Sequence, residues 1–321
     1  MINTIKTACD WLRNLAEPPI ILVVGDLMLD ETVNGVVDRI CPEAPVPVVD
    51  LNNEYHSAVL GGAANVAEGV RALGAETLLV GLHSHDKAGY EVEALLEKSG
   101  IRYLTIPAEA DRPTTRKVRV VSSGHQLIRL DYETREHISE TLELALMAKV
   151  FKQKVDAIIL SDYGKGVLPP SLISKIIKEA NSRGIKVYAD PKHVWEAYNG
   201  AFAMTPNVKE GRKSLKTVHR DPLKMSKDLS KWLDTIAVIT AGSEGAFALG
   251  KQFKAPEVLV ADVQGAGDSF IAAFAFWRTA FDTASAIQLA VLTATIAVAN
   301  PGTHRVTAEE FLRFAGKWLT E

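Results

Sequence analysis

The residues best suited to chemistry lie in a short glycine-rich stretch near the end of the chain. Gly265, Ala266 and Gly267 precede Asp268, and the apolar run that follows predicts a buried helix. The backbone N–H groups at the start of such a helix can hold an anion, and the helix dipole favours negative charge there. Asp268 could then accept a proton from a hydroxyl group that attacks a phosphoryl group. A plain alternative stays open, in which Asp268 only caps the helix.

A second glycine-rich stretch, "GGAANVAEGVRALGA", runs from Gly61 to Ala75 and opens an amphipathic pattern of helical period. Gly61 and Gly62 have no side chains, so a polyol could approach the backbone there. Asn65 can both donate hydrogen bonds to hydroxyl groups and accept them. The stretch therefore indicates a sugar-binding site, with a tightly packed helix start as the alternative.

The elements that must position these residues are visible as an alternation of strands and helices. Short apolar runs such as "IILVVG" from Ile20 and "DAIILSD" from Asp156 are typical of strands covered on both faces. Helix-length stretches, such as 63–73 and 170–183, lie between them. The pattern predicts an α/β fold with a doubly wound, mainly parallel sheet and right-handed crossovers.

Nearly every predicted strand is followed by polar residues, and ligands of open α/β sheets bind beyond the carboxyl ends of the strands. Any one of these residues is more simply explained as a turn or cap residue, but their accumulation favours a binding site. They are Asp26 and Asp30, Asp162 and Lys165, Asp190 and Lys192, Asn207 and Glu210, and Thr240, Gly242 and Gly245.

Two familiar nucleotide motifs are absent. "GAFALGKQ" has the spacing of a Walker A loop, but Gln252 replaces the Ser or Thr that would bind magnesium, and the middle of the motif is strand-like. "GAGDSF" begins like a dinucleotide fingerprint, yet Phe270 replaces the third glycine. A Rossmann dehydrogenase is therefore not expected.

Two segments, about 31–60 and 114–131, depart from the alternation. They are rich in valine and alternate polar with apolar residues, which predicts antiparallel strands or hairpins apart from the main sheet. We expect these strands to form a small β lid and the surface of a homodimer, with an extra sheet edge as the alternative. Without repeats or low-complexity tracts, the sequence predicts a single domain over residues 1–321.

The overall composition favours small-molecule partners. The chain has 321 residues, 47% of them hydrophobic, and a formal net charge of -3, so it gives no general electrostatic reason to expect nucleic acid or a membrane surface. Two cysteines make no disulfide framework, and no secretory leader is recognisable, so we expect a cytoplasmic protein. The apolar run 286–299 is too short for a membrane span and predicts a buried helix.

Taken in order, "GGAANVA", "TPN" followed by Glu210, "TAGSEG" and "GAGD" resemble the signatures of the ribokinase-like (PfkB) sugar kinases, from about Ile20 to the C-terminus. Further strings, notably "PEAPVPVV" and "SDYGKG", resemble a narrower group within that family. This group phosphorylates D-glycero-D-manno-heptose 7-phosphate on the way to ADP-heptose for lipopolysaccharide cores. The resemblance implies the form of that kinase without a fused nucleotidyltransferase.

The resemblance implies ATP and Mg²⁺ as cofactors and a 1,7-bisphosphate as product. Asp268 becomes the base that activates the anomeric hydroxyl, and the amides of Gly265, Ala266 and Gly267 stabilise the transferred phosphoryl group. The resemblance also implies that ATP and magnesium are bound by Asn207, Val208, Lys209 and Glu210, with Glu210 acting on the metal through water. It implies that the nucleotide pocket is lined by Thr240, Gly242 and Gly245. The sugar would be bound by Asp30, Gly61, Gly62 and Asn65, and a phosphate by Lys192.

Several points stay open at this stage. Lys117, Arg119 and Arg129 alternate along the presumed lid strands and are candidates for binding the substrate phosphate, although such residues are more often solvated. Gln264 replaces the small residue usual in the family beside a region that often binds a monovalent cation, so that cofactor is in doubt. The alternatives to the heptose kinase are another sugar or sugar-phosphate kinase and a non-catalytic sugar- or nucleotide-binding regulator.

Overall fold

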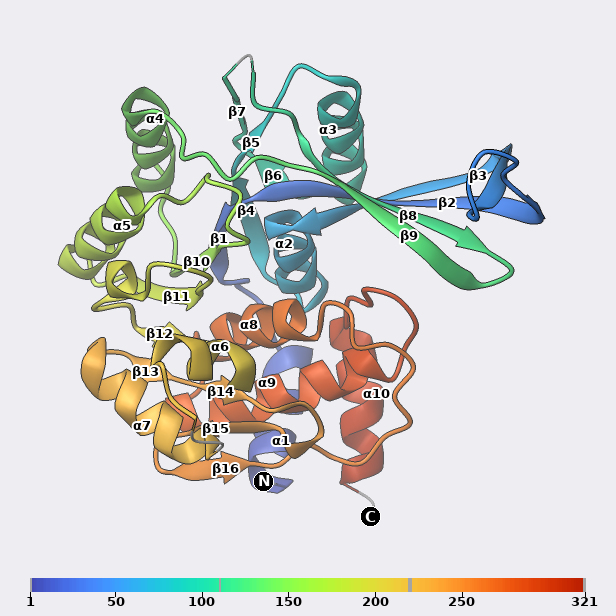
Figure 1. Cartoon of the computed structure of the whole chain (residues 1–321). Helices are drawn as coiled ribbons and strands as arrows, with labels where there is room; N and C mark the ends of the chain where they lie inside the picture. Colours follow the sequence, from blue (N-terminus) through green and yellow to red (C-terminus); the bar gives the residue numbers. More distant parts are fainter. Residues whose placement is uncertain (1, 110, 219–220, 320–321) are drawn as a thin grey trace.

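The centre of the molecule is a seven-stranded parallel sheet (Figure 1). The computed structural model describes residues 2–109, 111–218 and 221–319, with the backbone alone at 52–55. The strands in spatial order are β13 (Ile236–Ala237), β12 (Ala203–Met204), β11 (Lys186–Asp190), β10 (Ala157–Ser161), β1 (Ile20–Gly25), β4 (Glu76–Val80) and β6 (Arg102–Tyr103). From β1 the chain winds one way through β4 and β6 and then the other way from β10, which confirms the predicted doubly wound sheet.

Helices cover both faces of the sheet, and the alternation of side chains along β1 divides the interior into two cores. Ile21 and Val23 belong to the core on one face, which contains residues of α1 (Ile2–Arg13), α2 (Ala63–Ala72), α3 (Lys87–Ser99), α8 (Ala266–Trp277), α9 (Thr283–Val298) and α10 (Ala308–Trp318). Leu22 and Val24 belong to the other, with α4 (Glu140–Phe151), α5 (Pro170–Ser182) and α7 (Pro222–Trp232). The predicted helices 63–73 and 170–183 are confirmed to within one residue, and the predicted helix 286–299 begins three residues earlier, at Thr283. Helices α1 and α10 were not predicted.

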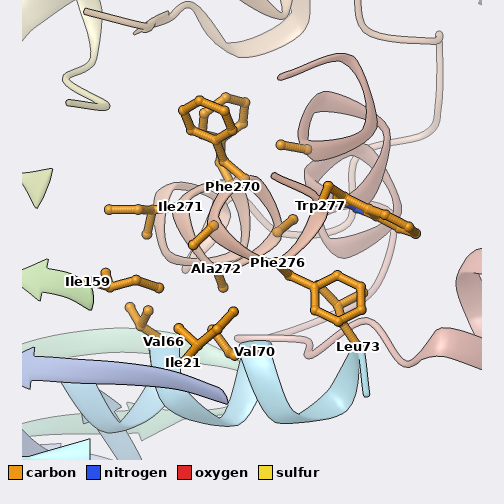
Figure 2. Packing of buried hydrophobic residues seen from close by; sticks show 14 of the residues in the cluster. Ile21, Val66, Val70, Leu73, Ile159, Phe270, Ile271, Ala272, Phe276 and Trp277 are labelled. Atoms are coloured by element: carbon orange, nitrogen blue, oxygen red, sulfur yellow. The ribbon is translucent and has the colours of Figure 1, made fainter. Parts of the chain in front are cut away.

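Helix α8 is deeply buried over most of its length. Every residue from Phe270 to Trp277 is buried, and Figure 2 shows Ala272 on the side of α8 that lies toward Val66 and Val70 of α2. Helix α9, the expected buried helix, lies beside it in the same core. In the part of the chain that the structure describes, no helix combines the length and apolarity needed to span a bilayer.

A second, four-stranded sheet projects from the body of the molecule (Figure 1). Its strands lie in the order β3 (Pro47–Gly62), β2 (Leu27–Ile40), β8 (Thr115–Ser122) and β9 (His125–Tyr132). The two hairpins are antiparallel, as the sequence predicts, but the pairing of β2 with β8 that joins them is parallel. The base of this sheet therefore brings residues near 30 next to residues near 117, and its action as a lid stays a prediction.

Short elements complete the fold around the strand ends. These are β5 (Leu82–His83), β7 (Ile106–Pro107), η1 (Trp195–Tyr198), α6 (Val208–Ser214), β14 (Ile239–Thr240), η2 (Gly242–Glu244), β15 (Ala246–Ala248) and β16 (Lys251–Phe253). The middle of "GAFALGKQ" is thus a strand, β15, which confirms that this motif is no Walker A loop.

The carboxyl ends of the central strands lie level with one another. Gly25 of β1 is paired with Ser161 of β10, which is in turn paired with Asp190 of β11. A Cβ at Gly25 would lie 2.0 Å from the carbonyl oxygen of Ser161, so only glycine allows this approach. The pairing continues into Asp26, whose N–H donates to the Ser161 carbonyl at 3.2 Å.

We predict that Gly25→Ala lowers the free energy of unfolding by about 1–3 kcal/mol, because the added methyl group must push β1 and β10 apart. Urea denaturation followed by circular dichroism measures this change. The control is Gly316→Ala in α10, where a Cβ would meet nothing within 4 Å and alanine should be neutral or stabilise the helix. Equal stability of Gly25→Ala and the wild type would contradict the account of this strand end.

Candidate active site

Two cavities meet at the carboxyl edge of the central sheet. The β2 cavity, of about 380 Å³, lies between the base of the four-stranded sheet and the start of α8. The α9 cavity, of about 720 Å³, is lined by residues of the strand ends, the 255–263 segment, α8 and α9. Both cavities are lined by Tyr163, Gly265 and Asp268, so these residues form their junction.

The glycine-rich turn at this junction opens α8 as the sequence predicts. Gly265 is the N-cap residue and has φ 71°, a left-handed conformation that favours glycine. A Cβ on Gly265 would also lie 3.3 Å from the side-chain nitrogen of Asn65. Gly265, Ala266 and Gly267 all line the α9 cavity, so the N-terminal amides of α8 lie beside that cavity.

Asp268 is held by side chains from two other parts of the chain. Asn65 of α2 donates to one carboxylate oxygen through Nδ2 at 2.7 Å, and the Tyr163 hydroxyl donates to the other. Burial raises the pKa of Asp268, and the hydrogen bonds from Tyr163 and Asn65 act in the opposite direction. Because Gly265 is the cap residue and Asp268 bonds these distant groups, capping does not account for this carboxylate.

The β2 cavity has a polar and cationic lining. Asp30 of β2 accepts a hydrogen bond from Arg119 of β8 at 2.8 Å, and Lys117 lies on the same strand as Arg119. A Cβ on Gly61 would lie 2.3 Å from Asp30 Oδ2, so the glycine leaves room for this carboxylate. The amide oxygen of Asn65 is buried without a hydrogen-bond partner. These groups could bind a polyol that carries a negative charge.

Arg129 is not brought into either cavity. Its guanidinium makes two hydrogen bonds to Asp131 on the same strand, at 2.7 and 2.8 Å, and its side chain is 47% exposed. The pairing of β8 with β9 places Arg129 opposite Arg119. Contact of Arg129 with a substrate phosphate therefore stays a prediction.

The α9 cavity contains a linked set of charges at the start of α6. Asn207 and Glu210 form a capping box, with mutual backbone-to-side-chain hydrogen bonds of 3.0 and 2.9 Å. Lys192 donates to Asp190 and to Glu210, each at 2.9 Å. The cavity is also lined by Thr240, Gly242 and Gly245, whereas Val208 packs against the hydrophobic core and Lys209 is exposed.

Burial and neighbouring charges shift the pKa values of this set strongly. Burial raises the pKa of Asp190 to about 7, although the ammonium of Lys192 lowers it. Burial alone would lower the pKa of Lys192, but the carboxylates of Asp190 and Glu210 outweigh it and raise the pKa above its usual range. Lys192 is therefore a fixed positive charge within the α9 cavity.

The donor set at Glu210 suits a magnesium ion that accompanies a nucleotide. In the described residues no cluster of three or more His, Cys, Asp or Glu side chains could hold a metal by itself. Magnesium commonly binds through one or two carboxylates together with substrate phosphates and water. The Glu210 carboxylate, which lines the α9 cavity, fits that mode.

Sequence reasoning missed two parts of the site. Tyr163 follows β10 inside "SDYGKG", and the only signal was its position after a predicted strand. The apolar wall of the α9 cavity was also missed, because it joins a loop to a distant helix; it consists of Val258, Val260, Val263, Val291, Ala294 and Val298.

A doubly wound sheet with two cavities that share one carboxylate suits an enzyme that brings two bound substrates together at the carboxyl edge of the sheet. The chain belongs to the pfkB family of carbohydrate kinases, whose family model matches residues 20–309. It is therefore a sugar kinase with the ribokinase-like fold.

Its relatives agree with this assignment. The chain is 36% identical over 325 residues to the "Bifunctional protein HldE" of Nitrobacter hamburgensis and 35% identical over 311 residues to that of Aliarcobacter butzleri. These alignments cover 95% and 94% of this chain but only 65% of each relative.

Two solved structures have the same fold. One is phosphofructokinase-2 from Escherichia coli in complex with potassium, with TM-score 0.78 and 18% identity over 95% of this chain and 100% of that one. The other is Arabidopsis thaliana ribokinase complexed with ribose and ATP, with TM-score 0.71 and 19% identity over 93% and 99%.

We predict that Lys192→Met weakens ATP binding about tenfold or more, because a charge-assisted contact is lost and two carboxylates are left unpaired in the α9 cavity. Isothermal titration calorimetry with Mg²⁺ and ATP measures the dissociation constant. Lys186→Met is the matched control, since Lys186 is the first residue of β11, whose far end precedes Lys192, and its ammonium lies 5.7 Å from the ring centroid of Phe202. Unchanged affinity in Lys192→Met would remove this residue from nucleotide binding.

Proposed function

We propose that this sugar kinase transfers the γ-phosphoryl group of ATP to the anomeric hydroxyl of D-glycero-D-manno-heptose 7-phosphate, giving the 1,7-bisphosphate and ADP. The observation that carries the proposal is the position of Asp268, whose carboxylate lines both cavities at once. The strings "PEAPVPVV" and "SDYGKG", which resemble heptose 7-phosphate kinases, support this sugar over others.

The α9 cavity would receive ATP. Its valine and alanine wall suits a purine base, and its polar end holds Lys192 and the amides at the start of α8. Magnesium bound at Glu210 through water would neutralise charge on the phosphates. The helix amides and Lys192 would then stabilise the charge on the transferred group without having to move.

The β2 cavity would receive the sugar. The Asp30 carboxylate can accept hydrogen bonds from sugar hydroxyls, and the unpartnered Asn65 Oδ1 can accept another. Lys117 and Arg119 give the same cavity two positive groups for the phosphate of the substrate. A sugar held there presents its reacting hydroxyl to Asp268.

The reaction needs one proton transfer and one phosphoryl transfer. Asp268 accepts the proton of the anomeric hydroxyl, the hydroxyl oxygen forms a bond to the γ-phosphorus, and the bond to the ADP oxygen breaks. Since burial raises the pKa of Asp268, this carboxylate is a stronger base than a free aspartate. Asp268 later releases the proton to solvent.

We also propose that two copies of the chain form a homodimer through the β lid, which is the four-stranded sheet. Large apolar side chains are exposed on the four-stranded sheet, among them Ile128 and Tyr132 of β9 and Val36 and Ile40 of β2. Exposed apolar side chains gathered on one element commonly mark a protein interface.

Two other expectations from the sequence stay predictions. They are the location of the protein in the cytoplasm and the use of a monovalent cation near Gln264.

We predict that Asp268→Asn lowers kcat by several orders of magnitude while the fold and ATP binding are retained, because the amide cannot accept the hydroxyl proton. A coupled assay of ADP release measures the rate. Asp282→Asn is the matched control: Asp282 caps α9, accepting from the N–H groups of Ala284 and Ser285 at 2.9 and 3.1 Å. Turnover retained in Asp268→Asn would exclude Asp268 as the base.

We predict that the enzyme turns over D-glycero-D-manno-heptose 7-phosphate faster than sugar 6- and 5-phosphates, and that Lys117→Met raises the KM for this substrate about tenfold or more by removing a positive charge from the β2 cavity. Initial rates over the panel give both results, and the KM for ATP should stay unchanged. Arg129→Glu serves as a second arm, since a normal KM in that variant rejects contact between Arg129 and the phosphate.

The same panel separates the alternatives. Preference for another sugar phosphate would identify a different kinase of the family. No turnover with any substrate, together with measurable binding of ATP or sugar phosphate, would favour a non-catalytic regulator.

A further inference from the structure

The loop after β10 is fixed by two buried carboxylates. Asp26, which is 0% exposed, accepts hydrogen bonds from the N–H groups of Tyr163, Lys165 and Val167 at 2.7, 3.2 and 3.2 Å. Asp162 accepts from the N–H of Gly164 at 2.7 Å. Burial raises the pKa of Asp26 to about 6, and these N–H groups act in the opposite direction. The backbone of Tyr163 therefore has one defined position.

The side chain of Tyr163 reaches from this loop to the junction of the cavities. Its hydroxyl donates to Asp268 Oδ1, and its ring lines both the β2 cavity and the α9 cavity. The ammonium groups of Lys117 and Lys192 lie 5.6 and 5.8 Å from the ring centroid. An aromatic ring at these distances attracts cations through its π face. Tyr163 thus contacts the carboxylate and one lysine from each cavity.

The phenol is a permanent donor toward Asp268. Burial and the charges of Asp268 and Asp190 raise the pKa of Tyr163 well above its usual range, so the hydroxyl is protonated near neutral pH. Other groups act on the same carboxylate: Asn65 from α2, Lys117 from β8, and Lys192 and Asp190 from the end of β11. Among these other groups Asn65 alone is a direct hydrogen-bond donor to Asp268 in the described part of the chain, and Tyr163 is the second donor.

We propose that Tyr163 is a positioning residue that holds the Asp268 carboxylate in its productive orientation and tunes its basicity. The inference rests on the proposed function, in which Asp268 is the base. With Asn65 on one oxygen and Tyr163 on the other, both ends of the carboxylate are fixed, and each oxygen keeps a second lone pair for the substrate hydroxyl. Without Tyr163, rotation of the carboxylate would be limited by Asn65 alone.

A neighbouring pair shows what a purely structural bond of the same type would do. Tyr198 donates to Asp162 Oδ2 at 2.6 Å, and Tyr198 is fully buried. Asp162 belongs to the same loop as Tyr163, yet it lines neither the β2 cavity nor the α9 cavity. Tyr198→Phe therefore removes an equivalent phenol-to-carboxylate hydrogen bond from a carboxylate that lines neither of the two cavities.

The test compares Tyr163→Phe with Tyr198→Phe. Tyr163→Phe keeps the ring and removes only the donor, so we expect kcat to fall about tenfold to a hundredfold while the KM for ATP is little changed. The loss of a donor to the charged carboxylate also favours its protonated form. Because the base must be unprotonated, the acid limb of kcat/KM should move to higher pH in Tyr163→Phe. Tyr198→Phe should lower stability without moving that limb.

Two further measurements keep this inference separate from the proposed function. Carbon-13 NMR titration of labelled aspartates, assigned with Asp268→Asn, follows the protonation of Asp268 without any substrate and should show the same upward shift in Tyr163→Phe. If Asp268→Asn is inactive but Tyr163→Phe keeps the wild-type rate, pH profile and titration, the role of Tyr163 is rejected and the base remains. If Asp268→Asn is active, the proposed function fails on its own account.

Discussion

Helix α8 can begin at only one place relative to the central sheet, because its residues from Phe270 to Trp277 are buried on every side. Sliding or rotating this helix would open voids against α2 and α9, and core packing resists such changes. The turn Gly265–Asp268 is consequently fixed at the carboxyl edge of the sheet, where both cavities end. The apolar character of the helix thus explains why a carboxylate at its start can be positioned so accurately.

The carboxyl edge of the sheet holds several buried carboxylates, and the groups around them reduce the free-energy cost of burying their negative charge. Asp26, Asp190 and Asp268 all have pKa values raised mainly by burial. Three backbone N–H groups surround Asp26, Lys192 neutralises Asp190, and two neutral donors serve Asp268. A buried carboxylate without such partners would be strongly unfavourable. The arrangement leaves Asp268 as the carboxylate that faces both cavities and has no direct ion-pair partner among the described residues.

Local patterns predicted most of the fold and many of the polar residues that line the two cavities. The apolar runs of β1 and β10 and the glycine turn before α8 carry their own signals, because strand burial and left-handed turns restrict residue types directly. The parallel pairing of β2 with β8 could not be predicted, since it depends on contacts far apart in the sequence. Tyr163 was missed for the same reason: its partner Asp268 is adjacent only in the fold. Arg129 resembled Arg119 in sequence, but its pairing with Asp131 is a tertiary property.

The most direct test of the central claim is a crystal structure of Asp268→Asn with D-glycero-D-manno-heptose 7-phosphate and ATP bound together. We expect the sugar in the β2 cavity and the nucleotide in the α9 cavity. The anomeric oxygen should lie within hydrogen-bond distance of residue 268, about 3 Å, and in line with the γ-phosphorus. A complex in which the anomeric oxygen points away from residue 268, or in which the γ-phosphate lies far from the start of α8, would contradict the assignment of Asp268 as the base.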